Sequence, residues 1–333
     1  MGRGQVDLGG DVVVVRAVRV HEFGGPEVLR AEEVPAPVAG PGQVVVGMEV
    51  ADVIFLDTLL RNGWGGEYFP LTLPYVPGGG GAGHVLSVGE GVDPAWLGRH
   101  VISRGSGGYA EQMLFPAEEI VAVPDGLGSA EAAALVHDGV TALMLARRAE
   151  IRKDEWVLVA AATGGAGSLL VQLLRDAGAR VVAAARGERK LALSRELGAD
   201  LAVDYSLDGW QHQVREATGG VGLAFDGAGG PLGRAVFETV ADGGRFITYG
   251  TSDGFADIDP DLAARRQVHV DNALEAGTPD PATVRALLTD ALTLTAQGRL
   301  RPVIGATYPL AEAAKAHRSL EERTTLGKSL LLV

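Results

Sequence analysis

Residues 156–200 constrain the fold of this chain more than any other segment. An apolar run at 156–161 leads into a turn with three glycines, residues 162–167, and then into an apolar stretch with helical spacing. A second apolar run, residues 180–185, follows. This order predicts a βαβ unit, in which the turn and the N-terminus of the helix can hold an anionic phosphate group.

The glycines of this turn fit a dinucleotide-binding loop. Gly164 permits a tight turn, Gly165 lets the backbone approach a pyrophosphate, and Gly167 lets the helix pack closely on the strand. Ala162 stands where the G-x-G-x-x-G fingerprint has its first glycine. The turn therefore predicts a dinucleotide site, and an ordinary glycine-rich turn of an α/β domain is the alternative.

The end of the second strand indicates which dinucleotide would bind. An NAD site usually carries Asp or Glu there, to accept hydrogen bonds from the ribose 2′-hydroxyl. This strand ends in Ala185, and the cations Arg186, Arg189 and Lys190 follow. Guanidinium and ammonium groups suit a 2′-phosphate, so the sequence favours NADP over NAD. Incidental basic residues on a solvated helix are the alternative.

Length and composition place further bounds on the protein. A chain of 333 residues is expected to form two domains. A net charge of −13 argues against a nucleic-acid partner. The apolar stretches are only as long as a strand and too short to span a membrane, so no membrane partner is expected. Residues 1–11 lack the apolar region of a signal peptide and are expected to be a loose leader. The cytoplasm is the expected compartment.

The chain has no cysteine, so disulfides, thiolate nucleophiles and cysteine-based zinc sites are excluded. Its 7 histidines are scattered singly, and no G-x-S-x-G elbow of a hydrolase is present. We therefore expect no metal.

The pattern along the chain divides into two parts. Short strands expected at 12–20, 44–50, 84–88, 100–103 and 110–115 suggest a β-rich, barrel-like domain. A helix is expected at 129–150, broken or kinked near Gly139. Alternating strands (156–161, 180–185, 201–204, 222–226, 244–249) and helices (166–177, 188–197, 208–217, 231–241) then predict a doubly wound parallel sheet. Helices at 281–297 and 309–320 and a strand at 329–333 should return the chain to the first domain.

Several motifs occur in an order that resembles the medium-chain dehydrogenase/reductase superfamily, in particular its zinc-independent quinone oxidoreductase branch. They are Phe-Gly-Gly-Pro-Glu-Val-Leu (23–29), Pro-Gly-Gln-Val (41–44), Tyr-Val-Pro-Gly (75–78), Val-Gly-Glu-Gly-Val (88–92), Gly-Gly-Tyr-Ala-Glu (107–111), Glu-Leu-Gly-Ala-Asp (196–200) and Arg-Thr-Thr-Leu-Gly-Lys (323–328). The resemblance covers nearly the whole chain after residue 14.

The resemblance implies a Rossmann-type domain at 138–276 and a GroES-like barrel catalytic domain at 12–137 plus 277–333, with NADPH in the cleft between them. It further implies cofactor-binding positions along both domains. These are Thr141, Thr163, Gly164, Gly165, Ala166, Gly167, Asp226, Gly250 and Lys328, with Arg186, Lys190, Tyr205 and Arg323 placed for the 2′-phosphate. It also implies a homodimer, for which we expect the strand at 245–249 to form the edge.

The chain departs from the branch at its substrate wall. Ile54 and Leu59 replace an Asn and a Tyr, so with Tyr75 the pocket should be largely apolar. The expected reaction is hydride transfer to a quinone or an α,β-unsaturated carbonyl, a small hydrophobic acceptor. Solvent or a group at the cleft would supply the proton; the candidates are Asp57, Arg61, His137 and Asp138, although Asp57 and Arg61 could simply form a helical ion pair. An enoyl reductase that tailors a secondary metabolite and a non-catalytic NADPH-binding protein are the alternatives.

Overall fold

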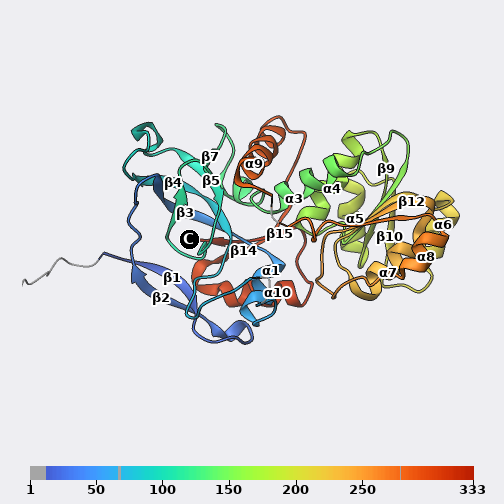
Figure 1. The fold of residues 1–333 in the computed structure, drawn as a ribbon, viewed down its shortest axis with the longest axis horizontal. Helices are drawn as coiled ribbons and strands as arrows, with labels where there is room; N and C mark the ends of the chain where they lie inside the picture. Colours follow the sequence, from blue (N-terminus) through green and yellow to red (C-terminus); the bar gives the residue numbers. More distant parts are fainter. Residues whose placement is uncertain (1–12, 67–68, 278) are drawn as a thin grey trace, which may run out of the picture.

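The computed structural model describes residues 13–66, 69–277 and 279–333. The expected leader at 1–11 lies outside these residues. Two sheets with their helices lie side by side, one formed by the first and last parts of the chain and one by its middle (Figure 1). The arrangement is a Rossmann-type domain next to a GroES-like domain, as the sequence predicts.

The middle of the chain forms a sheet of six parallel strands in the order β10-β9-β8-β11-β12-β13. The strands are β8 (Trp156–Ala160), β9 (Arg180–Ala185), β10 (Leu201–Asp204), β11 (Val221–Asp226), β12 (Val240–Thr248) and β13 (His269–Asn272). The chain starts at the centre and winds outward in both directions. Ligands of such sheets bind where the winding reverses, beyond the carboxyl ends of the central strands.

Strands β8, β9 and β11 carry apolar side chains on both faces of the sheet. Helices therefore cover both faces and shield these side chains from water. The helices are α4 (Gly165–Asp176), α5 (Glu188–Glu196), α6 (Trp210–Thr218), α7 (Gly230–Thr239) and α8 (Pro260–Arg265). Leu169, Leu170 and Leu174 of α4 are fully buried. These contacts fix the N-terminus of α4 against the end of β8.

The sequence pattern did not predict β13, and this strand corrects one expectation. Residues 245–249 were expected to form a free edge, but β12 lies between β11 and β13. Of the described strands of this sheet, β13 is the outer one on this side. It is only four residues long and half exposed, so it lacks the apolar run that reveals the central strands.

The other domain is built on a seven-stranded sheet in the order β14-β15-β3-β4-β5-β7, with β6 also paired to β3. Its members are β3 (Gln43–Val53), β4 (Gly80–Val88), β5 (His100–Arg104), β6 (Gln112–Pro116), β7 (Val121–Ala122), β14 (Ile304–Pro309) and β15 (Lys328–Leu332). A separate hairpin pairs β1 (Val14–Val20) with β2 (Leu29–Pro35). Because β15 pairs with β3, the end of the chain joins the first part.

The helix expected at 129–150 is two helices, α2 (Ser129–Ala133) and α3 (Asp138–Arg148). The break lies before Gly139, and Gly139 itself is in the first turn of α3. A Cβ there would lie 3.1 Å from the Cβ of Ala291, so the glycine allows α9 (Pro281–Ala296) to pack closely on α3. Helix α3 also packs on α4 of the Rossmann-type domain, so α3 lies where the two domains meet (Figure 1).

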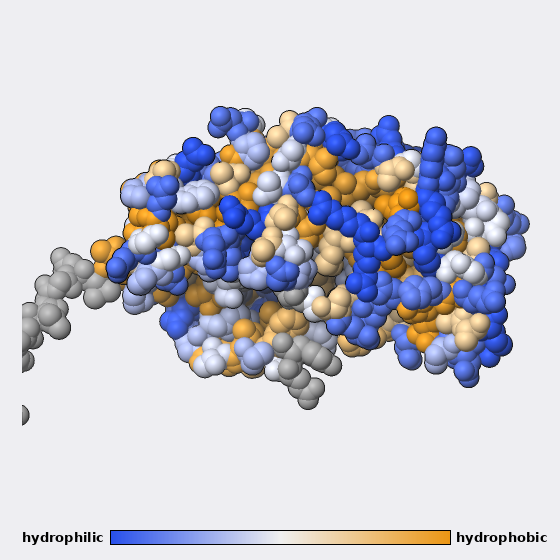
Figure 2. Space-filling model, turned by 45° about the horizontal axis from the view of Figure 1, so that its top comes forward, coloured by the Kyte–Doolittle hydropathy of each residue, from blue (hydrophilic) through white to orange (hydrophobic). Residues whose placement is uncertain are grey.

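Two short helices complete the domain of β3. Helix α1 (Phe55–Arg61) follows β3, and α10 (Ala313–Glu321) packs against it. The helix expected at 309–320 starts later, because β14 extends to Pro309 and residues 310–312 form a 3-10 turn before α10. In the described residues no helix is long and apolar enough to cross a membrane. On the face shown in Figure 2, hydrophobic residues form separate small areas among hydrophilic ones.

Candidate functional site

The turn between β8 and α4 has the close approaches of a nucleotide-binding loop. Ala161 adopts a left-handed backbone conformation with a φ of +52°. This conformation therefore falls one residue before Ala162, which stands at the first glycine of the fingerprint. A Cβ on Gly167 would lie 2.4 Å from the carbonyl oxygen of Ala161, which is closer than any side chain tolerates. Gly164 then caps α4, and the free N–H groups of that helix face the turn. The expected role of Gly167 in close helix–strand packing fits this geometry.

Gly165 has a second neighbour that the sequence did not reveal. A Cβ at this position would lie 1.9 Å from Oδ2 of Asp138, so the carboxylate rests directly beside the N-terminus of α4. Asp138 is the first residue of α3, and Thr141 lies one turn further along the same helix, half-buried. The start of α3 therefore lines the glycine turn.

The last segment of the chain closes the other side of the turn. The N–H of Gly327 donates to the carbonyl oxygen of Thr163 at 2.7 Å, and Gly164 and Gly327 form a parallel bridge. Gly327 has a φ of +63°, and a Cβ there would lie 2.1 Å from the carbonyl oxygen of Val303. The glycine of the 323–328 motif thus lets the end of one domain reach the nucleotide loop of the other.

Four segments of the chain bring the four expected 2′-phosphate residues together. The guanidinium of Arg186 lies 5.8 Å from the ring of Tyr205, after β9 and β10 respectively. On α5, Nζ of Lys190 donates to the carbonyl oxygen of Arg323 at 2.9 Å. The side chain of Arg323 also binds Asp253 at 3.1 Å. This group, Arg186, Lys190, Tyr205 and Arg323, is called the basic cluster below.

The basic cluster has more positive charge than its described partners neutralise. Burial lowers the pKa of Lys190, and the charges of Arg186 and Arg323 lower it further. The same two guanidinium groups act against the burial that raises the pKa of Tyr205. Mutual repulsion of this kind is relieved when an anion binds, so the cluster suits a phosphate.

Two other expected cofactor residues have mainly structural contacts. Asp226 is fully buried and accepts hydrogen bonds from the N–H groups of Ala228 and Gly229 and from the hydroxyl of Thr248. It therefore shapes the turn after β11. A Cβ on Gly250 would lie 2.0 Å from the carbonyl oxygen of Gly227, so the turns after β11 and β12 touch.

Four charged side chains meet between β3, β15 and α3. Nδ1 of His137 lies 2.6 Å from Oδ2 of Asp52, and Nζ of Lys328 lies 3.2 Å from the same oxygen and 2.9 Å from Oδ2 of Asp138. We call these four residues the cleft cluster. Lys328 was expected to bind the cofactor, and the structure gives its ammonium two carboxylate partners.

Asp52 is the member of the cleft cluster that sequence reasoning missed. Its side chain is fully buried, and Oδ1 has no hydrogen-bond partner among the described residues. Burial opposes its ionisation, but the charges of His137 and Lys328 outweigh burial and lower its pKa to about 2. The available signal was a carboxylate between apolar residues near the end of β3, where the only other carboxylate of the strand, Glu49, is exposed.

Asp57 and Arg61 lie in a separate buried network, and they do not pair with each other. Oδ2 of Asp57 accepts from the N–H of Ile54 and from the hydroxyl of Tyr109, both at 3.0 Å. Arg61, with no exposed surface, forms an ion pair with Glu321 and donates to the carbonyl oxygen of Gly24 at 3.0 Å. The idea of a simple ion pair within α1 is therefore wrong.

His317 connects the two halves of this network. Its Nε2 lies 3.0 Å from the hydroxyl of Tyr109, and its Nδ1 lies 3.4 Å from the guanidinium of Arg61. Burial, with the charge of Arg61, lowers the pKa of His317 to about 3, so the ring is neutral. We assign Nε2 as the donor to Tyr109, because the phenol donates to Asp57. The network joins α1 to α10.

Two of the three residues expected to form the substrate wall lie at α1. Ile54 and Leu59 are half-buried at the start and in the middle of α1. The phenol oxygen of Tyr75 is buried without a hydrogen-bond partner among the described residues, and burial raises the pKa of this phenol to about 12. A buried donor without a partner is costly, which marks Tyr75 as a place where a ligand oxygen can bind.

The donors needed for a zinc site are missing. The chain has no cysteine, and the residues that the structure describes contain no group of three His, Asp or Glu side chains able to hold a metal ion. The residues present therefore do not fit a catalytic zinc ion.

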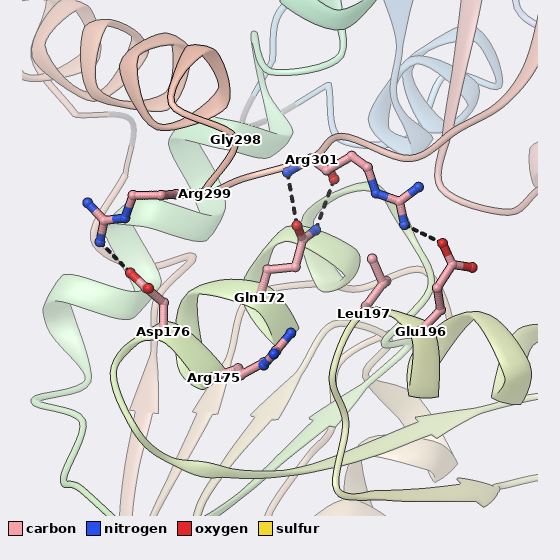
Figure 3. Close-up of a pocket in the computed structure, with 8 residues that line it drawn as sticks. All are labelled: Gln172, Arg175, Asp176, Glu196, Leu197, Gly298, Arg299 and Arg301. Atoms are coloured by element: carbon pink, nitrogen blue, oxygen red, sulfur yellow. Dashed lines mark hydrogen bonds and ion pairs between the residues drawn. The ribbon is translucent and has the colours of Figure 1, made fainter.

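A hollow of about 470 Å³ lies away from the nucleotide turn, between α4, the end of α5 and residues 298–301 (Figure 3). The side-chain amide of Gln172 binds both the N–H and the carbonyl oxygen of Arg301 at 2.9 Å. Arg301 pairs with Glu196 at 2.6 Å, and Arg299 pairs with Asp176. These bonds hold the last part of the chain onto α4 and leave the hollow polar and shallow.

Comparisons with known proteins agree with this arrangement. Residues 40–125 match the alcohol dehydrogenase GroES-like domain, and residues 197–331 match the family described as zinc-binding dehydrogenase. A 2-haloacrylate reductase of a Burkholderia species is 31% identical, over 96% of this chain and 99% of the relative.

Solved structures are similar over nearly the whole chain. A mycobacterial protein in complex with NADPH is 33% identical with a TM-score of 0.87, over 96% of this chain and all of the other. An NAD-dependent alcohol dehydrogenase is 32% identical with the same score, over 96% and 99%. The quinone oxidoreductase of Escherichia coli in complex with NADPH is 26% identical with a TM-score of 0.88, over 96% and 100%.

Proposed function

This chain belongs to the medium-chain dehydrogenase/reductase superfamily, and from that premise we propose that it is an NADPH-dependent, zinc-independent reductase of quinones or α,β-unsaturated carbonyl compounds. The basic cluster carries the proposal. Cations that follow β9, on α5 and in the tail converge beside the nucleotide sheet, and β9 itself ends without a carboxylate. The nearby Asp204 of β10 accepts from the N–H of Gly187 at 2.8 Å. That combination favours NADPH over NADH.

The residues present fit the cofactor in three places. Thr163–Gly167 and the N-terminus of α4 would hold the pyrophosphate, and the basic cluster would hold the 2′-phosphate. Asp138 and Thr141 at the start of α3 would lie beside the bound cofactor. NADPH, when bound, supplies the hydride. The protein's part is to orient the acceptor, exclude water and provide a proton.

The acceptor is expected to be electron-poor, because the chain has no cysteine and its described residues form no group of three side chains that could hold a metal ion to polarise a carbonyl group. Quinones and conjugated alkenes meet this requirement. A relative named for reduction of a 2-haloacrylate and a structural neighbour named quinone oxidoreductase support both acceptor classes. The half-buried Ile54 and Leu59 favour the more apolar members.

A steady-state screen of quinones and enones under saturating NADPH tests the proposal. We expect acceptor-dependent oxidation of NADPH that survives exhaustive EDTA treatment. Binding of NADPH without turnover of any acceptor would overturn the proposed activity. Loss of turnover with EDTA, restored by zinc, would overturn its zinc independence.

Cofactor choice gives the first specific prediction. NADPH should bind at least about tenfold more tightly than NADH, or about 1.4 kcal/mol. Lys190→Ala and Arg323→Ala should weaken NADPH and leave NADH nearly unchanged, as measured by fluorescence titration. Arg189→Ala is the matched control, because it removes an exposed cation of α5 outside the basic cluster. Equal losses for both cofactors would contradict the assignment.

A further inference from the structure

The cleft cluster holds a histidine in one defined orientation. His137 precedes α3, and its side chain is only 13% exposed. Nδ1 points to Oδ2 of Asp52 at 2.6 Å, which is the length of a charge-assisted hydrogen bond. Nε2 has no hydrogen-bond partner among the described residues. The ring therefore presents one free nitrogen.

Gly79 makes this orientation sterically possible. A Cβ at position 79 would lie 2.6 Å from Cε1 and 2.7 Å from Nε2 of His137. The free edge of the imidazole thus lies directly against the backbone before β4. An alanine at this position would force the ring to move while leaving every charge in place.

The cluster lies at the expected cleft between the domains. Asp52 is near the end of β3, two residues before Ile54 of the expected substrate wall. Lys328 follows Gly327, which binds the nucleotide turn, and Asp138 lies beside Gly165. The ion pairs of Lys328 with Asp52 and with Asp138 therefore connect the expected substrate wall to the nucleotide turn.

We propose that Asp52 is a positioning residue that fixes His137 with its proton-bearing Nε2 toward the substrate, so that His137 donates the proton that completes reduction. This inference rests on the proposed function. Hydride addition to the acceptor moves an electron pair onto its carbonyl oxygen, giving an anion. Nε2 of the imidazolium gives its proton to this anion, its N–H bond breaks as the new C–H or O–H bond forms, and solvent later returns a proton to the ring.

The charges around His137 support this role. Asp52 and Asp138 together carry two negative charges and Lys328 one positive charge, so the imidazolium form of His137 makes the cleft cluster neutral. Arg104 and Asp57 also act electrostatically on this region from β5 and α1. With a neutral ring, one carboxylate charge of the cleft cluster has no counter-charge.

The test compares His137→Gln, Asp52→Asn and Gly79→Ala with the wild type. His137→Gln should lower kcat about 100-fold, remove the fall of kcat at high pH and change the Kd of NADPH less than about twofold. Asp52→Asn should lower kcat about tenfold and move that fall to lower pH. Gly79→Ala should reproduce the loss in kcat without any change of charge. It replaces Asp52→Asn in the test if that variant does not fold.

A second measurement does not depend on turnover. Nitrogen-15 NMR of the wild type should show a proton on Nδ1 of His137, and Asp52→Asn should weaken that signature. Wild-type kcat and an unchanged pH profile in His137→Gln would overturn this inference while the reductase stands. Absence of turnover in the wild type with every acceptor would instead overturn the proposed function. An Nδ1 without a proton in the wild type would refute the positioning role of Asp52 in either case.

Discussion

At the scale of single residues, two buried aspartates near the expected substrate wall have pKa values shifted in opposite directions. The charges of His137 and Lys328 keep Asp52 ionised, whereas burial raises the pKa of Asp57 from 3.8 to about 6. Asp57 has only neutral hydrogen-bond donors, the N–H of Ile54 and the hydroxyl of Tyr109. The type of partner, and not the degree of burial, decides the difference.

This difference predicts a pH dependence of stability. The folded chain retains the proton of Asp57 up to about pH 6, whereas the unfolded chain releases it near 3.8. The contribution of Asp57 to the free energy of unfolding is therefore fully present below about pH 4 and falls as the pH rises through 6. Asp57→Asn removes this fall. Between pH 5 and pH 8 the free energy of unfolding of the variant should therefore rise by on the order of 1 kcal/mol relative to that of the wild type.

Chemical denaturation of the wild type and Asp57→Asn at the two pH values measures the effect. Asp280→Asn is the control, because hydrogen bonds from Thr283 lower the pKa of Asp280 and its contribution does not change in this range. An equal change for both variants would show that Asp57 does not retain its proton.

The substrate wall gives a second prediction at this scale. Leu59→Tyr adds a polar group to an apolar wall, so it should raise kcat/KM for simple quinones several-fold and lower it for bulky apolar acceptors. An apolar wall gains about 25 cal/mol for each Å² of apolar surface that it buries, and it penalises an unpaired polar group. Leu60→Tyr, also half-buried on α1, is the control. Equal responses of both acceptor classes would show that Leu59 does not line the site.

At the scale of secondary structure, one glycine sets how α4 meets β8. A Cβ on Gly167 would overlap the carbonyl oxygen of Ala161, whereas a Cβ on Gly164 would be 3.3 Å from the same atom. Alanine normally favours a helix by about 1 kcal/mol over glycine. Here the overlap is with backbone, which cannot turn away, so the steric cost exceeds that gain.

Gly167→Ala should therefore lower the free energy of unfolding by about 1–3 kcal/mol and weaken NADPH binding. Gly164→Ala, in the same turn, should change stability by less than about 0.5 kcal/mol. Denaturant titration of both variants provides the measurement. A stable Gly167→Ala variant would mean that the helix can shift without cost.

At the scale of the whole molecule, residues 323–328 run along the proposed cofactor site. Arg323 belongs to the basic cluster, Gly327 binds the nucleotide turn, and Lys328 belongs to the cleft cluster. Because β15 continues from this segment into the other sheet, the cofactor site requires both domains to be in place. A chain cut before this segment would retain most of one domain and lose the site.

The free edge of the nucleotide sheet predicts the oligomeric state. We propose a homodimer formed by pairing of β13 with its copy, because β13 is bonded only to β12 among the described strands. Val270 on this strand is 38% exposed. Val270→Asp should shift a dimer to a monomer in analytical ultracentrifugation, whereas Val270→Thr should not. A concentration-independent monomer in the wild type would contradict the proposal.

The sequence by itself determined the Rossmann-type sheet, the break near Gly139 and the cations that follow β9. These features depend on apolar runs, on glycines and on residue types next to one another in the chain, which are local properties. Tyr205 and Arg323 were placed in the basic cluster by the family resemblance. The short, partly exposed strands β13 and β14 give no such pattern, and neither was predicted.

Only the tertiary structure decided which charged groups meet. Asp52, His137 and Lys328 are up to 276 residues apart in sequence, and so are not linked by any spacing rule. Their contact arises because β15 pairs with β3 and α3 begins beside both strands. The same holds for Arg61 and Glu321, which meet because α1 packs on α10. Electrostatic partners are set by distance in space, and the packing of the two sheets fixes that distance.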